Sequence, residues 1–117
     1  GHKVGWLTLH AGIAGGADII LIPEIPYHID KVLEAIDKRT KSGKGFTVLA
    51  VAEGAICAED LKLSKKDYKK KMEKNNYPSV AYELADQILK KSGNEVRITV
   101  RKTYGHDAAR IYEVRLY

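Results

Sequence analysis

Two uninterrupted apolar runs constrain the fold of this chain more than any other feature. Residues 18–22 read Asp-Ile-Ile-Leu-Ile, and residues 46–52 read Phe-Thr-Val-Leu-Ala-Val-Ala. A strand with one side in solvent would alternate apolar and polar residues, but these runs do not, and both contain β-branched residues. Each run is therefore typical of a strand that is buried on both faces, as in a parallel sheet covered by helices.

Three segments around these runs have the pattern of helices. Residues 4–13 are apolar on nearly every side, which predicts a helix packed on several faces, and Gly15 and Gly16 follow as a left-handed cap. Residues 29–41 and 79–92 have apolar side chains three and four positions apart, which predicts two amphipathic helices. Their apolar faces consist of Ile29, Val32, Leu33 and Ile36 in the first, and of Val80, Leu84 and Ile88 in the second.

Residues 95–117 have the pattern of a β-hairpin. Apolar and polar residues alternate in 95–100 and again in 112–116, and turn-forming residues separate the two stretches. Strands that alternate with helices indicate right-handed crossovers and a parallel sheet. We therefore expect one α/β domain over residues 1–117, a three-layer fragment with a mainly parallel sheet and a C-terminal antiparallel hairpin at its edge.

The net charge of +5 comes largely from one polar excursion, residues 56–77, in which Ser64 is placed to cap a short helix. Its lysines are Lys62, Lys65, Lys66, Lys69, Lys70, Lys71 and Lys74. They form either a solvated helix surface or a phosphate-binding patch. Nucleic-acid binding is disfavoured, because the run has almost no arginines or interleaved aromatic residues.

Composition excludes several other classes of protein. Every apolar stretch is shorter than the roughly 18 residues that a membrane helix needs. Cys57 is the only cysteine, so the chain can form neither an internal disulfide nor a cysteine metal cluster. The histidines show no metal-ligand spacing. We expect a cytoplasmic protein with no membrane, nucleic-acid or metal partner.

Two acidic residues follow the predicted buried strands directly. Glu24 comes after the first and Glu53 after the second. In open parallel sheets ligands bind beyond the carboxyl ends of the strands, where a carboxylate can accept hydrogen bonds from sugar hydroxyls. Exposed loop charges or helix-capping anions would give the same pattern, so the residues alone leave both interpretations open.

Four segments, in order, resemble landmarks of the 6-phosphofructokinase family. They are residues 1–18 (a Gly-x-x-x-Gly-Trp-Leu-x-Leu pattern), 20–24 (Ile-Leu-Ile-Pro-Glu), 51–55 (Val-Ala-Glu-Gly-Ala) and 94–100 (Asn-Glu-Val-Arg-Ile-Thr-Val). The likeness covers residues 1–100, and the lysine-rich excursion is similar to an insertion found in a subgroup. Residues 101–117 do not match the family.

The resemblance implies roles for three residues. Glu53 matches a glutamate that hydrogen-bonds the hydroxyls of fructose 6-phosphate. Arg97 matches an arginine that reaches the 6-phosphate from a neighbouring subunit, which implies a homo-oligomer. Gly1 matches the glycine of a Met-Gly-Arg motif, although His2 stands in place of the arginine and Gly1-His2 is also compatible with a tag remnant. Arg110 echoes a downstream phosphate motif out of register, so no role is transferred to it.

The departures from the family define the expected activity. The family uses Mg²⁺ with ATP or pyrophosphate, and its donor-binding glycines and Thr-x-Asp-x-Asp segment match nothing in this sequence. We therefore expect a phosphofructokinase fragment without catalytic residues or cofactor, inactive alone and weak in binding fructose 6-phosphate. An engineered or recombined α/β scaffold without catalytic function is the alternative. A nucleic-acid-binding module is a third hypothesis, which depends on charge alone.

Overall fold

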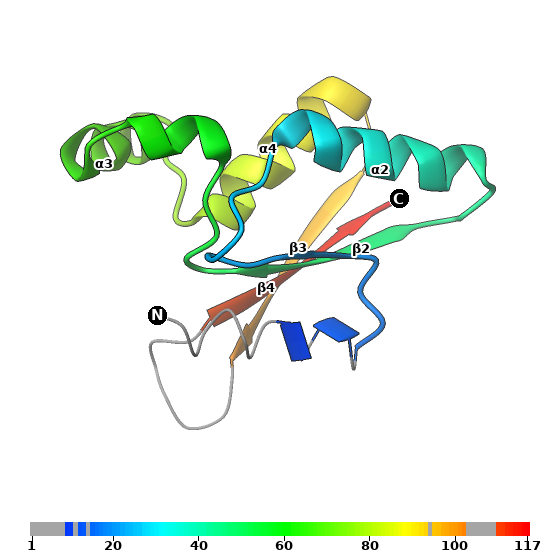
Figure 1. The fold of residues 1–117 in the computed structure, drawn as a ribbon. Helices are drawn as coiled ribbons and strands as arrows, with labels where there is room; N and C mark the ends of the chain where they lie inside the picture. The colour runs from blue at the N-terminus through cyan, green and yellow to red at the C-terminus, as the bar shows by residue number, and fades with distance from the viewer. Residues whose placement is uncertain (1–8, 11, 14, 94, 103–109) are drawn as a thin grey trace.

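The computed structural model describes residues 9–10, 12–13, 15–93, 95–102 and 110–117, and its described strands form one four-stranded sheet (Figure 1). The strands are β1 (Ile19–Leu21), β2 (Thr47–Ala52), β3 (Val96–Lys102) and β4 (Arg110–Leu116), in the order β1-β2-β4-β3. β1 is parallel to β2, whereas β4 is antiparallel to both of its neighbours. The sheet is therefore mixed.

The predicted α/β class and the hairpin over residues 95–117 are confirmed, but the predicted mainly parallel sheet is wrong. β4 does not lie outside β3; it lies between β2 and β3, so that β1 and β3 are the edge strands of the described sheet. The expectation that the first apolar run is buried on both faces is therefore wrong, because β1 lies at an edge and only its Leu21 is buried. The composition of β3 and β4 explains their order. β4 buries Ile111, Tyr112, Val114 and Leu116, which point to both sides of the sheet, whereas β3 exposes Arg97 and Thr99.

Two helices, α2 (Ile29–Lys41) and α4 (Val80–Ser92), cover one face of the sheet (Figure 1). Their predicted apolar faces are confirmed, because their apolar residues join those of the strands in one core. The largest fully buried apolar side chains of this core are Leu49, Leu84, Ile88, Leu116, Val51 and Val114. Burial of such side chains is the main source of the stability of the domain.

The opposite face of the sheet, here called the lower face, includes Val48, Ala50 and Ile111. Part of it is covered by helical residues 9–10 and 12–13, which belong to the helix predicted for residues 4–13. A Cβ on Gly12 would lie 2.8 Å from Ile20 Cδ1 and 3.3 Å from Ala50 Cβ, so any larger residue would force the Ile20 side chain to move. Gly16, at φ 73°, ends the segment in a left-handed cap, as predicted.

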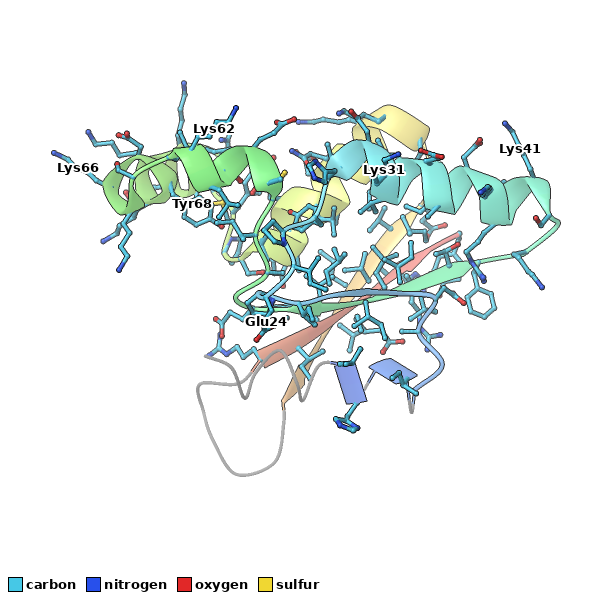
Figure 2. All side chains as sticks on the ribbon, in the orientation of Figure 1. Glu24, Lys31, Lys41, Lys62, Lys66 and Tyr68 are labelled. Carbon is cyan, nitrogen blue, oxygen red and sulfur yellow. The ribbon has the colours of Figure 1, made fainter. Side chains whose placement is uncertain are left out.

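The polar excursion forms a short 3₁₀ helix, η1 (Ala58–Lys62), and the helix α3 (Lys65–Lys74). Ser64 caps α3 by accepting a hydrogen bond from the backbone N–H of Asp67 at 3.1 Å, as predicted. None of the ten residues of α3 is buried, and the helix extends beyond the sheet (Figure 1). In Figure 2 the side chains of Lys62 and Lys66 point away from the domain.

Candidate functional site

The loops that follow β1 and β2 lie side by side at the carboxyl ends of these strands. The Tyr27 N–H donates to the Ile56 carbonyl at 3.0 Å, and the Ala58 N–H donates to the Tyr27 carbonyl at 2.8 Å. A Cβ on Gly54 would lie 3.1 Å from Pro23 Cγ, so the two loops are in close contact. This region, here called the carboxyl edge, is the position where α/β sheets bind ligands.

The carboxyl edge carries both predicted acidic residues. Glu53 lies in a tight turn that is closed by a 3.0 Å hydrogen bond from the Ala55 N–H to the Ala52 carbonyl, and its side chain is exposed. Glu24 is also exposed, in the loop after β1 (Figure 2). Both carboxylates are therefore accessible to a ligand that approaches this edge.

Arg110, the first residue of β4, joins Glu53 at the carboxyl edge. The Glu53 N–H donates to the Arg110 carbonyl at 3.0 Å, which makes the two residues direct cross-strand neighbours, and Arg110 is exposed. In the sequence, Arg110 is only an out-of-register echo of a family phosphate motif, so no role is transferred to it there. The alternation in residues 110–116 predicts the strand, but only the pairing of β4 with β2 reveals that Arg110 lies beside Glu53.

Arg97 does not lie near Glu53, because the mainly parallel sheet that could have placed their strands side by side is not formed. β2 and β3 run in the same direction, but β4 separates them. Through β4, Arg97 aligns with Val48, five residues before Glu53. The two residues are therefore about 16 Å apart along the sheet and about 10 Å apart across it. Gly1 lies outside the described residues.

Arg97 has exposed surroundings at the other end of the sheet. Its Nη2 lies 3.5 Å from Glu95 Oε1, and its guanidinium lies over the Tyr117 ring at 5.4 Å from the ring centre. Arg115 is its direct cross-strand neighbour. A cationic group in this position can bind an anion in solvent or on a second molecule, but it cannot share a small ligand with Glu53 of the same chain.

A buried charged cluster holds α3 against the domain. Lys71 Nζ lies 2.7 Å from Asp60 Oδ1 and 2.8 Å from Glu83 Oε1, and the two carboxylate side chains are only 6% and 2% exposed. Burial disfavours the ammonium, but hydrogen bonds to the two carboxylates outweigh it and raise the pKa of Lys71. Burial, with a contribution from Glu83, also raises the pKa of Tyr27.

The described residues provide neither a metal site nor an accessible cysteine. No group of three or more His, Cys, Asp or Glu side chains among them is placed to hold a metal ion. Cys57 is buried, which makes it inaccessible to reagents in the folded protein. No helix in the described part of the chain combines the length and the apolar character that crossing a membrane requires.

Comparison with known proteins identifies the family. The family model described as Phosphofructokinase matches residues 1–106, which is most of the chain. This chain belongs to the phosphofructokinase family. The sequence resemblance is thereby confirmed, but the match extends over residues 101–106, which were expected to lie outside the family. β4 is the described strand that lies beyond the matched residues.

Curated relatives of this phosphofructokinase-family chain carry the name ATP-dependent 6-phosphofructokinase. The protein of Spirochaeta thermophila is 49% identical over 100 residues, which are 86% of this chain and 27% of that protein. The protein of Corynebacterium efficiens is 32% identical over 100 residues, or 29% of its length. The protein of Propionibacterium freudenreichii is 58% identical over 55 residues, which are 47% of this chain and 15% of that protein.

The chain therefore spans less than a third of the length of these relatives. No solved structure matches it.

Proposed function

We propose that this chain is the sugar-phosphate-binding part of a 6-phosphofructokinase and that fructose 6-phosphate binds at its carboxyl edge. The observation that carries the proposal is the pairing of Glu53 with Arg110 in a chain of this family. A carboxylate can accept hydrogen bonds from sugar hydroxyls, and a guanidinium fork can bind a phosphate dianion in two parallel hydrogen bonds. Both side chains are exposed at the edge where α/β sheets bind ligands.

Arg97 has a separate role in this proposal. Because it lies at the far end of the sheet from Glu53, it would contact a phosphate held by a neighbouring copy, in agreement with the role that the family resemblance implies. A homo-oligomer is part of the proposal for that reason. The proposal also places Gly1 beside the substrate, as its match to the glycine of the Met-Gly-Arg motif implies.

Phosphoryl transfer is not proposed for these 117 residues alone. Transfer requires groups that hold the donor and its Mg²⁺ and a base that orients the acceptor hydroxyl. No Thr-x-Asp-x-Asp segment occurs in the sequence, and the described residues provide no metal site. The relatives named above are ATP-dependent, so ATP is the proposed donor of the whole enzyme. A cytoplasmic, glycolytic setting completes the proposal.

One observation favours a second candidate, a recombined α/β scaffold without catalytic function. β4 lies beyond the residues that match the family, yet it occupies an interior position in the sheet. In this alternative β4 was acquired by recombination and covers an edge of β2 that another segment once covered. A parent gene in which residues 101–117 continue the same reading frame would exclude recombination.

The binding proposal can be tested by ligand-induced stabilisation. Fructose 6-phosphate should raise the thermal unfolding midpoint with a dissociation constant on the order of millimolar, since the chain spans less than a third of the length of its relatives and lacks the contacts that the rest would supply. Glu53→Gln and Arg110→Gln should each weaken this effect, whereas Glu59→Gln, at an exposed position of η1, should not. Equal stabilisation of the parent protein and of both carboxyl-edge variants would refute the proposed site.

A further inference from the structure

Arg97 and Arg115 lie directly opposite one another across β3 and β4. Two residues further along, the Tyr117 N–H donates to the Glu95 carbonyl at 2.8 Å, so the Arg97–Arg115 pair is of the hydrogen-bonded type with Cα atoms about 5.5 Å apart. Val96, Ile98 and Leu116, which flank this pair in sequence, pack into the core beneath α2 and α4. Both arginines therefore project from the lower face.

Like charges in this arrangement repel, so the pair requires negative charge nearby. Arg115 has a close partner, because its Nε lies 2.6 Å from Glu113 Oε1 and the Glu113 side chain is only 16% exposed. Arg97 has a looser one, because Glu95 lies 3.5 Å away and the two side chains are 70% and 66% exposed. An exposed pair of this kind contributes little free energy, so a stronger anion can replace Glu95 at low cost.

Tyr117 lies on the same face of the sheet as the two arginines. The Arg97 guanidinium lies over its ring, and Tyr117 follows Arg115 by two residues, so both side chains lie on the same face of the sheet. The Phe46 ring packs against Tyr117 with the ring centres 6.5 Å apart. These contacts restrict the Arg97 guanidinium, and the Glu113 contact restricts that of Arg115, which reduces the entropy lost when a ligand binds between them.

We propose that Arg97, braced by Tyr117, and Arg115 form a binding site for the phosphate group of a phosphate monoester. The phosphate would accept hydrogen bonds from both guanidinium groups and displace Glu95 from Arg97. This inference rests on the proposed function in one respect, the phosphate role of Arg97. It adds Arg115 and Tyr117, which lie beyond the residues that match the family.

The experiment follows the Nε–Hε resonances of both arginines in ¹⁵N-labelled protein during titration with fructose 6-phosphate, inorganic phosphate and fructose. Both phosphate compounds should shift Arg97 and Arg115 together, and fructose should shift neither. Binding of inorganic phosphate alone with no response to fructose 6-phosphate would overturn the assignment to phosphate monoesters. So would a shift of Arg97 that leaves Arg115 unchanged.

Variants separate a specific site from general attraction of anions. Arg97→Gln and Arg115→Gln should each weaken phosphate binding about tenfold. Arg115→Lys keeps a positive charge beside Glu113 but loses the fork, so it should also weaken binding while it preserves the fold. Glu95→Gln should strengthen binding. The control is Lys41→Gln on α2, which removes an exposed charge that pairs with Asp37; a loss as large as that of Arg115→Gln would overturn the inference.

The same titration distinguishes this inference from the proposed function. If fructose 6-phosphate shifts the amides of Glu53 and Arg110 but neither arginine side chain of the pair, the carboxyl-edge site stands and the arginine pair is refuted. If both phosphate compounds shift the arginine pair while Glu53 does not respond, the arginine pair stands and the carboxyl-edge site is refuted.

Discussion

Replacing Lys71 with methionine would test what holds α3 on the domain. Methionine retains most of the length of the side chain but removes the ammonium that lies 2.7 Å from Asp60 Oδ1 and 2.8 Å from Glu83 Oε1. Asp60 and Glu83 would then remain buried without their cationic partner. Tyr68 and Met72 of α3 are half-buried, and none of its residues is fully buried, so the contact of Lys71 is a major part of its attachment.

The expected loss of stability follows from this geometry. Removing one partner of a buried ion pair costs about 3–5 kcal/mol. Lys71 retains 35% side-chain exposure, so water screens part of the interaction and the lower end, about 3 kcal/mol, applies. In a domain of this length such a loss lowers the melting temperature by about 10 °C.

Urea unfolding and thermal unfolding followed by circular dichroism would measure the change. Lys70→Met is the matched control, because Lys70 lies next to Lys71 on α3 but is exposed, and its effect should stay within about 0.5 kcal/mol. Adding Glu83→Gln to Lys71→Met should restore part of the stability, because it removes one unpaired charge. Equal stability of Lys71→Met and Lys70→Met would refute this account of the cluster.

Two further predictions concern packing and pH dependence. Gly12→Ala should destabilise the protein by about 1–3 kcal/mol in urea unfolding, since the new Cβ would approach Ile20 Cδ1 to 2.8 Å; Gly45→Ala, with open space around it, should not. In Tyr77→Phe, the hydrogen bond from the Tyr77 hydroxyl to Asp86 Oδ2 is lost. This bond raises the pKa of Tyr77 from 10.0 to about 12, so the stability difference between the parent protein and the variant should vanish as pH rises from about 10 to 12. The bond also lowers the pKa of Asp86, so the difference should vanish again as pH falls through that lowered pKa. A difference independent of pH over both ranges would contradict the assignment.

The local elements could be predicted because their signals are local. The apolar spacing of α2 and α4, the apolar runs of β1 and β2, and the serine at 64 that caps α3 each depend on a few neighbouring residues. The position of β4 could not be predicted in this way. Hairpin formation is a local property, but the choice of β4 rather than β3 as the neighbour of β2 depends on burial across the whole sheet.

The same distinction applies to the functional residues. Glu24 and Glu53 follow the two apolar runs directly, so their place at the carboxyl edge could be predicted. The place of Arg110 at that edge, and of Arg97 at the opposite end of the sheet, could not be predicted, because both depend on the position of β4 between β2 and β3.

Lys71 shows a similar limit in the lysine-rich excursion. The other lysines of the excursion are exposed, as the interpretation as a solvated helix surface predicts, but no sequence pattern distinguishes Lys71 from Lys70. Its buried partners Asp60 and Glu83 come from separate segments, so only the tertiary structure reveals this contact.

The most direct test of a sugar-phosphate site at the carboxyl edge is an amide chemical-shift titration with fructose 6-phosphate. The account predicts that the amides of Glu53 and Arg110 move together along one saturating curve, and that Glu53→Gln shifts this curve to higher ligand concentrations. Shifts confined to other parts of the chain, with Glu53 and Arg110 unchanged at saturation, would contradict it.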